Sequence, residues 1–330
     1  MDTTRLLLKL ENVTKRFPGV LALDSVSLEV LAGETHGLMG ENGAGKSTLI
    51  KTLTGAYQAD SGQIWIDGQT LKSLTPRHAM QLGIACIYQE LNLIPHLSVV
   101  ENIFLGREIC GHEALGVGLL RRRDMLVQAE KLLQELGLGF DVKARVGTLG
   151  VGHQQMVEIC RAVIANAKLI IMDEPTSSLS EKEAEDLFRI IAQVKARGVT
   201  VLFISHRLDE VKRICDRVTV MRDGRTVSCV SMAETSVDEI VRLMVGREIQ
   251  NKYPKVKARH GEPVLSVKNL SRKGILHDVS FTLYAGEVLG FAGLVGAGRT
   301  ETMRAVTGAD AIDSGTIEVF GKEVLIRNPR

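Results

Sequence analysis

The spacing of hydrophobic and polar residues predicts strands that alternate with helices. Residues 6–13 and 26–30 alternate in polarity, as a β-strand with one buried face does. Short apolar runs predict four buried strands, at 35–39, 84–88, 169–172 and 199–204. Helices are predicted at 46–54, 121–138, 154–165 and 181–196. This order indicates an α/β fold with a parallel sheet covered by helices.

Two further features of the pattern divide the chain. Residues 97–165 contain no convincing strand and are predicted as a helical insertion. The stretch LAGETHGLMGENGAGKST at 31–48 is matched by YAGEVLGFAGLVGAGRTE at 284–301, so that Gly33 corresponds to Gly286 and Lys46 to Arg299. A repeat of this length indicates two copies of one domain rather than a solenoid of short units.

The repeat predicts three parts of the chain. Residues 1–245 form a complete first copy, 246–262 a polar and basic linker with one proline, and 263–330 the N-terminal part of a second copy. The second copy is expected to be a fragment of a longer tandem protein or a natural truncation. Because about 70 residues rarely build an adequate core alone, we expect this part to be marginally stable or docked on the first copy.

Composition excludes several classes of protein. A net charge of +2 and an aromatic content of 4% argue against a broad nucleic-acid interface. Five cysteines without a C-x-x-C spacing favour reduced thiols over a disulfide framework or a zinc site. No apolar run approaches the roughly 18 residues of a membrane span, and the N-terminus does not resemble a signal peptide. We therefore expect a cytoplasmic protein that needs a separate partner for any work at a membrane.

A glycine-rich segment, Gly40-Glu-Asn-Gly-Ala-Gly-Lys-Ser47, matches the phosphate-loop pattern G-x-x-x-x-G-K-[ST]. Its glycines let the backbone curl so that N–H groups point at phosphate oxygens, and the following helix adds its positive N-terminal end. Lys46 is expected to contact the outer phosphates and the Ser47 hydroxyl to coordinate Mg²⁺. The predicted strand before the loop and helix after it supply the required context.

Two carboxylates end the apolar run at 169–172. Because the carboxyl end of a parallel strand lies beside the phosphate loop in such folds, Asp173 is expected in the Mg²⁺ shell. Glu174 is placed to orient or deprotonate an attacking water. Without the phosphate loop, a pair of acidic loop residues would be the simpler interpretation.

The order of these motifs resembles the ATP-binding-cassette family. After the phosphate loop come Tyr88-Gln89-Glu90, then 149–155, then Asp-Glu-Pro-Thr at 173–176, then Ser205-His206. The resemblance implies a P-loop NTPase with a RecA-like core, an antiparallel β subdomain and a helical subdomain. It implies Mg-ATP as the ligand, Gln89 as a residue that contacts Mg²⁺ and senses the nucleotide, and His206 at the γ-phosphate.

The expected site follows from the motifs and the resemblance together. The catalytic residues are Glu174, His206 and Gln89, and the Mg²⁺ ligands are Ser47, Gln89 and Asp173. The nucleotide-binding residues are Phe17, Gly40, Glu41, Asn42, Gly43, Ala44, Gly45, Lys46, Ser47, Thr48 and Asp173. Phe17 is expected to lie against adenine, although a core phenylalanine is the common alternative.

More narrowly, YQELNLIPHLSVVENIFLGRE at 88–108 and MVGRE at 244–248 resemble the ATP-binding subunits of bacterial monosaccharide importers, the ribose type above all. That resemblance implies ATP-driven sugar import, with this chain peripheral at the cytoplasmic face of the inner membrane. It implies an integral-membrane permease, docked by the segment after Gln89, and indirectly a periplasmic sugar-binding protein. No nucleic-acid partner is expected.

The chain departs from the family pattern at three places. The signature, roughly L-S-G-G-Q, is replaced by Leu149, Gly150, Val151, Gly152 and His153, without the serine hydroxyl. Ser180 stands where many cassettes carry an aspartate. The second phosphate loop is degenerate, with Arg299 in place of lysine, and comprises Gly293, Gly298, Arg299 and Thr300. In a dimer of cassettes each ATP lies between one loop and the opposite signature, so we expect good binding but slow hydrolysis.

Two other functions stay open at this stage. One is a remnant that binds ATP without driving transport. The other is a soluble tandem-cassette factor that acts on ribosomes or nucleic acid; the degenerate loop and the short linker count against it.

Overall fold

The computed structural model of the chain describes residues 5–71, 73–111, 119–245, 261–293 and 296–329. The chain divides into two compact units, Met1–Ile249 and Gln250–Arg330. The boundary falls within the predicted linker, of which residues 246–260 lie outside the described residues.

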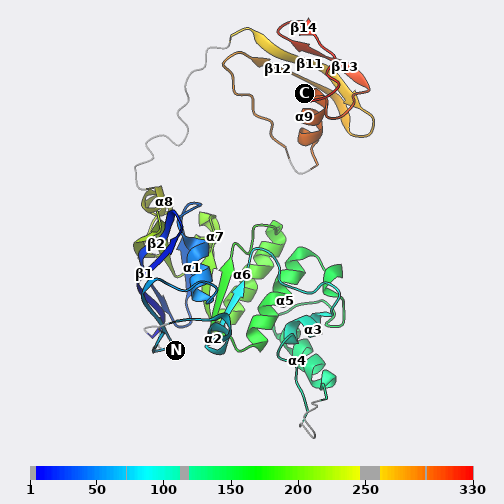
Figure 1. Cartoon of the computed structure of the whole chain (residues 1–330). Coiled ribbons are helices and arrows are strands. Elements are labelled where there is room, and N and C mark those ends of the chain that lie inside the picture. Colours follow the sequence, from blue (N-terminus) through cyan, green and yellow to red (C-terminus); the bar gives the residue numbers. More distant parts are fainter. Residues whose placement is uncertain (1–4, 72, 112–118, 246–260, 294–295, 330) are drawn as a thin grey trace. The chain divides into compact units, whose positions relative to one another are not determined.

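The described residues of the first unit form ten strands, of which Figure 1 labels β1 and β2. They are β1 (Leu6–Phe17), β2 (Val20–Leu31), β3 (Thr35–Met39), β4 (Ser61–Ile66), β5 (Gln69–Leu71), β6 (Ile84–Ile87), β7 (Leu169–Asp173), β8 (Thr200–Ile204), β9 (Arg217–Arg222) and β10 (Arg225–Ser231). Its helices are α1 (Lys46–Leu53), α2 (Pro76–Gln81), α3 (Val99–Phe104), α4 (Arg122–Glu135), α5 (Val151–Ile164), α6 (Glu181–Ala196), α7 (Leu208–Ile214) and α8 (Val237–Val245), with a 3₁₀ turn at Val146–Thr148.

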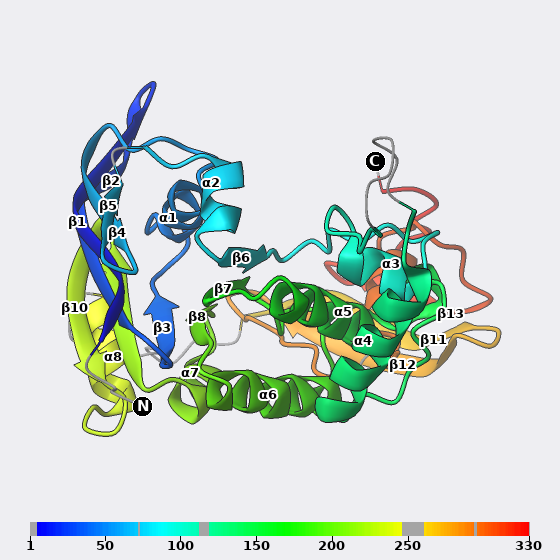
Figure 2. The same cartoon turned by 90° about the horizontal axis from the view of Figure 1, so that it is seen from below.

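Two sheets organise the first unit. A six-stranded sheet has the order β10-β9-β3-β8-β7-β6, in which all pairs are parallel except β9 with β10. A four-stranded antiparallel sheet has the order β2-β1-β4-β5. Figure 2 shows the antiparallel sheet and α1 on one side of the six-stranded sheet, and α5 and α6 on the other. The parallel sheet predicted from the strand order is confirmed.

Side chains from both faces of the central strands are buried. Along β7, Leu169 and Ile171 pack toward α1 and the antiparallel sheet, whereas Ile170 and Met172 pack toward α5 and α6. The period of two therefore places every apolar residue of this strand in one core or the other, which explains its continuous apolar run. Between residues 97 and 165, the described part of the chain forms only helices, the 3₁₀ turn and isolated bridges.

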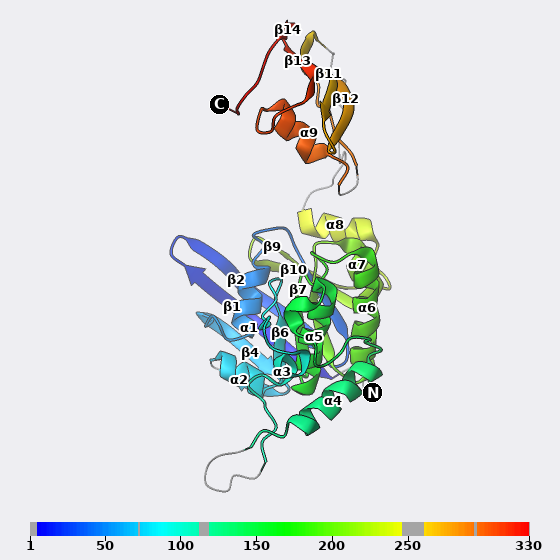
Figure 3. The same cartoon turned by 90° about the vertical axis from the view of Figure 1, so that its right-hand side faces the viewer.

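The second unit holds β11 (Pro263–Arg272), β12 (Leu276–Tyr284), α9 (Arg299–Val306), β13 (Ser314–Val319) and β14 (Lys322–Glu323). Its sheet has the order β12-β11-β13-β14, and Figure 3 shows α9 along one face of it. Six buried residues form its small core: Val267, Leu270, Leu276, Ala305, Val306 and Ile317. Across the described residues of both units, no helix is long and apolar enough to cross a bilayer.

Candidate nucleotide site

The loop between β3 and α1 depends on glycine at several positions. Gly43 and Gly45 have φ angles of 86° and 98°, in the left-handed region that side chains disfavour. A Cβ atom at Gly40 would lie 2.4 Å from the carbonyl oxygen of Met221 on β9. The loop can therefore pass this close to the sheet only with glycine at residue 40.

Lys46 is the first residue of α1, and 8% of it is exposed. Its Nζ donates to the carbonyl oxygens of Gly40, at 2.6 Å, and Glu41, at 3.0 Å. Burial lowers the pKa of this ammonium, an effect that the charges of Glu174 and Asp173 oppose. The loop thus folds around the ammonium of Lys46. This positive charge and the N-terminus of α1 both favour binding of an anion there.

A cleft of about 580 Å³ opens beside this loop. Its lining residues are Val20, Leu21, Ala22, Asn42, Gly43, Gly45, Lys46, Ser47, Thr48, Gln89, Asp173, Glu174, Asp223 and Gly224. The structure therefore brings nine of the predicted site residues to one cleft. In the sequence these nine residues fall in three separate places, at 42–48, 89 and 173–174.

Three of the lining residues are those expected to hold Mg²⁺. Ser47, Gln89 and Asp173 offer a hydroxyl, an amide oxygen and a carboxylate, the hard oxygen ligands that Mg²⁺ prefers. Burial raises the pKa of Asp173, and the neighbouring charge of Glu174 raises it further. A divalent cation would relieve both effects, so these residues fit the ion, with phosphate and water supplying the remaining ligands.

Five lining residues were not among the predicted site residues: Val20, Leu21, Ala22, Asp223 and Gly224. The last two form the turn between β9 and β10, with φ angles of 50° and 75°. An Asp-Gly dipeptide between apolar runs is a strong hairpin signal, and could have located this turn. Phe17 is not a lining residue; its ring packs edge-on against Tyr57, with centroids 5.2 Å apart.

The proposed catalytic pair comes from two adjacent strands. Glu174 follows β7 and has a φ of 47°, and its amide donates to the carbonyl of Ile204 at the end of β8. His206 follows β8, and its Nδ1 lies 3.2 Å from Glu174 Oε1. The His206 side chain is 58% exposed and that of Glu174 20%, so the pair is accessible to a ligand from solvent.

The residues expected to form a degenerate signature, 149–153, lie at the start of α5. This helix begins at Val151, three residues before the predicted start of 154, because Gly150 already has an extended N-cap conformation. Gly150 supplies no capping side chain. A Cβ at Gly152 would lie 2.6 Å from Glu183 Oε1, while the ring of His153 lies against Phe140, with centroids 5.2 Å apart.

Ser180, which stands at the position of the family's aspartate, is the N-cap of α6. Its hydroxyl accepts from the Glu183 amide, and the Glu183 carboxylate accepts from the Ser180 amide and hydroxyl, which completes a capping box. The sequence analysis missed this role, although Ser-x-x-Glu before a helix is its usual signal.

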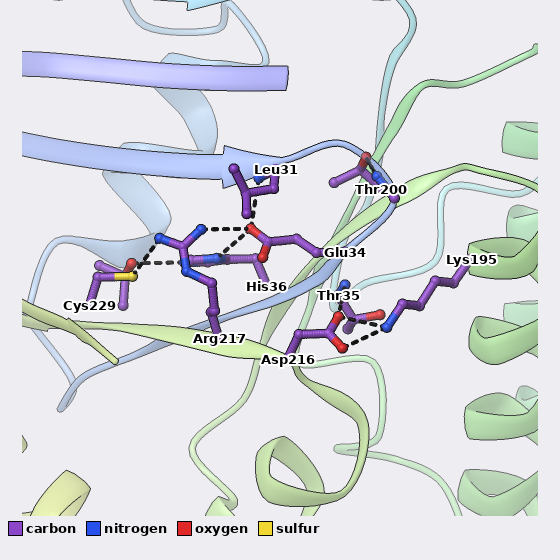
Figure 4. Close-up of polar contacts among 11 residues, drawn as sticks. Leu31, Glu34, Thr35, His36, Lys195, Thr200, Asp216, Arg217 and Cys229 are labelled. Carbon is purple, nitrogen blue, oxygen red and sulfur yellow. Dashed lines mark hydrogen bonds and ion pairs between the residues drawn. The ribbon is translucent and has the colours of Figure 1, made fainter. Parts of the chain in front are cut away.

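A buried polar network lies around the start of β3, the strand that leads into the phosphate loop (Figure 4). His36 on β3 is fully buried, with Nδ1 2.9 Å from Glu34 Oε1 and Nε2 2.8 Å from Thr219 Oγ1. The same Glu34 oxygen accepts from the amide of Leu31 and lies 3.5 Å from Arg217 Nη1. These contacts join β3 to β2 and β9 near its N-terminal end.

The second unit contains a glycine-rich loop at the positions that the sequence repeat pairs with residues 40–47. Gly298 is the N-cap of α9 with a φ of 81°, and Arg299 and Thr300 begin the helix. A Cβ at Gly293 would lie 2.9 Å from the Cβ of Ala297, the same distance that separates a Cβ at Gly40 from Ala44. Unlike Lys46, Arg299 is exposed.

Known proteins resemble this chain over nearly its whole length. The ribose import ATP-binding protein of Rubrobacter xylanophilus is 52% identical over 324 residues, and that of Geobacillus kaustophilus 48% over 325. Each match covers 98% of this chain, but only 64% and 65% of the respective relative. The chain thus spans less than two thirds of the length of these relatives.

Solved structures show the same fold. An ATP-binding cassette of an ABC transporter in its ADP conformation is 31% identical, with a TM-score of 0.63, over 73% of this chain and 96% of its own. A nucleotide-free cassette is 29% identical, with a TM-score of 0.61, over 74% and 98%. The family model described as "ABC transporter" matches residues 23–177 and 276–329, more than half of the sequence. The chain therefore belongs to the ABC transporter family.

Proposed function

We propose that this chain binds Mg-ATP in the cleft beside the 40–47 loop and hydrolyses it to drive sugar import. The observation that carries the proposal is the convergence of Lys46, Ser47, Gln89, Asp173 and Glu174 on one cleft. The 3.2 Å contact between Glu174 and His206 places an imidazole beside a carboxylate that lines that cleft.

Each residue has a defined task in this proposal. Loop amides and Lys46 hold the β- and γ-phosphates, and Ser47, Gln89 and Asp173 hold Mg²⁺, which neutralises phosphate charge when bound. Glu174 accepts a proton from the attacking water as its oxygen bonds to the γ-phosphorus and the bond to the bridging oxygen breaks. His206 is placed to contact the γ-phosphate from beside Glu174.

The substrate class rests on the relatives, which are ribose import proteins. By that similarity, the chain works at the cytoplasmic face of the inner membrane with an integral-membrane sugar permease. A periplasmic sugar-binding protein delivers the sugar to that permease. The segment of this chain after Gln89 docks on the permease.

We further propose that residues 263–330 are part of a second, degenerate cassette. Left-handed residues recur at matching positions: Ser25 and Asp278 both have a φ of 52°, and Asp67 and Phe320 have 50° and 49°. The strand order β12-β11-β13-β14 parallels β2-β1-β4-β5. The second match of the family model, 276–329, supports the same interpretation.

We also propose that this chain alone hydrolyses ATP slowly. Gly150 offers no hydroxyl at the N-terminus of α5, and Arg299 replaces the loop lysine in the second unit. In a dimer of cassettes, a complete signature from another chain or segment would then be needed to complete the site at Lys46.

The first test is Mg-ATP binding by the purified chain, with steady-state ATPase activity measured in parallel. Lys46→Ala is expected to weaken binding at least about tenfold, because it removes a charged contact to phosphate. Lys131→Ala, on the exposed face of α4, is the matched control and should bind normally. Failure of the unaltered chain to bind Mg-ATP would overturn the proposal. Sugar uptake by vesicles that contain the chain and its permease tests transport itself.

A further inference from the structure

Glu210 is a buried carboxylate to which the proposed mechanism assigns no role. It lies on α7, and 3% of the residue is exposed. Its Oε2 accepts from Thr176 Oγ1 at 2.7 Å and from Ser205 Oγ at 2.9 Å. A buried charge is costly unless it is paired and hydrogen-bonded, so these contacts are required to keep it there.

The second oxygen of Glu210 contacts the other side of the histidine loop. Oε1 lies 2.7 Å from Arg207 Nη1, as an ion pair that is not aligned as a hydrogen bond. The Arg207 amide in turn donates to Ser205 Oγ at 3.0 Å. Glu210 is therefore in contact with the residue before His206 and the residue after it.

Thr176 connects Glu210 to the loop that carries Glu174. Thr176 is 3% exposed and lies two residues beyond Glu174. The turn between them is closed by the Ser177 amide, which donates to the Glu174 carbonyl at 3.2 Å. A movement of Thr176 would thus be transmitted to the backbone of Glu174.

Besides the Glu174–His206 contact itself, one described backbone hydrogen bond joins the two loops. The Glu174 amide donates to the Ile204 carbonyl at 3.0 Å, which fixes the base of the loops at the edge of the sheet. Glu210 supplies a further point of attachment, through Thr176 on one loop and through Ser205 and Arg207 on the other.

We propose that Glu210 is a positioning residue that sets the separation of the two loops and so holds Glu174 beside His206. The claim that Glu210 thereby supports catalysis rests on the proposed function, because only hydrolysis uses the Glu174–His206 pair. The claim that Glu210 holds the two loops together, here called the mechanical part, does not depend on hydrolysis and is tested separately.

Hydrogen exchange of the full chain, measured by mass spectrometry with Mg-ATP present, tests the mechanical part. Glu210→Gln removes the charge, and Thr176→Val removes one hydroxyl donor with little change of shape. Each is expected to raise exchange about tenfold or more in peptides that cover 174–179 and 204–208, while exchange in α6 stays unchanged. Thr176→Ser retains the hydroxyl and should behave as the unaltered chain does.

The control is Glu185→Gln, which breaks an exposed ion pair between α6 and Arg213 on the same helix, α7. It should leave both loops unchanged. A rise in only one loop, a rise of equal size in α6, or no rise at all would overturn the proposal. If Glu210→Gln does not fold, the comparison of Thr176→Val with Thr176→Ser decides.

ATPase measurements test whether this positioning of the loops affects catalysis. Where the unaltered chain shows turnover, Thr176→Val should lower kcat with little change in ATP affinity, and Thr176→Ser should restore kcat. Equal kcat in all three proteins, despite altered exchange, would show that the loops need no such positioning. Absence of measurable turnover in the unaltered chain agrees with the need for a signature from another chain or segment, and the exchange result then decides on Glu210.

Discussion

The Nδ1 atom of His206 lies 3.2 Å from Oε1 of Glu174, although the two residues follow different strands of the sheet. The contact arises because β7 and β8 are parallel neighbours whose register pairs Asp173 with Ile204. Parallel strands end at the same edge, so Glu174, the first residue after β7, and His206, the second after β8, come together there. The pair is thus a direct consequence of sheet register.

Glu174→Gln should abolish most hydrolysis while ATP stays bound. The amide keeps the shape of the side chain but cannot accept a proton from water, and general bases contribute typically about 10²–10⁴-fold. Parallel measurements of kcat and of nucleotide affinity will check this. A variant that retains more than about a tenth of the kcat would assign the base to another residue.

Gly40→Ala should destabilise the first unit by about 1–3 kcal/mol, the usual effect of overpacking. The added methyl would meet the Met221 carbonyl at 2.4 Å, a backbone atom that cannot turn aside. Thermal unfolding is the measurement, and ATP affinity should fall as well. Gly150→Ala is the matched control, because a Cβ there meets nothing within 4 Å and its φ of −62° is ordinary. Equal losses in both variants would contradict the steric explanation.

His36→Leu should lower the free energy of unfolding by about 1–3 kcal/mol, because it leaves buried polar groups without a partner. Thr219 would lose its contact with Nε2, and Glu34 its contact with Nδ1. Denaturant titration compares this variant with Glu11→Gln, which alters an exposed carboxylate on β1. We expect little effect of the control. An equally stable His36→Leu would mean that neighbouring groups or water replace the imidazole.

Asp310 should make the second unit sensitive to acid. Its pKa is about 2, below the ordinary 3.8, because Arg304 and then Arg272 donate to the carboxylate. Since the folded pKa lies below the unfolded one, this stabilisation is complete above pH 4 and is lost as the pH falls toward 2. Hydrogen exchange of β11 and α9 between pH 5 and 2 measures the loss. Asp310→Asn should flatten that dependence, and an unchanged pH profile would contradict it.

The sequence predicted those elements best whose residues fit only one kind of environment. The apolar runs of β3, β7 and β8 are buried on both faces, so their strands could be identified from composition and length alone. The phosphate loop was predictable because only glycine suits its backbone. The helix 121–138 proved to be Arg122–Glu135, since the ends of a helix depend on caps more than on periodicity.

Other features depend on contacts between distant residues. His36 and Thr219 are 183 positions apart, and Glu210 reaches Thr176 across 34. No local pattern distinguishes Glu210 from an exposed helix glutamate. The β9–β10 hairpin was missed for a different reason: its Asp-Gly turn is a local signal that the sequence analysis did not use.

The sequence repeat pairs residues 288–292 of the second unit with the strand β3 of the first, yet these residues belong to no strand. In the first unit β8 and β9 flank β3, and all five of its residues are buried. Val288 is 98% exposed and Phe291 40%. Such a segment offers exposed apolar side chains and backbone N–H and C=O groups outside any strand. During expression the second unit should therefore be prone to self-association, and a charge at Val288 should raise its solubility.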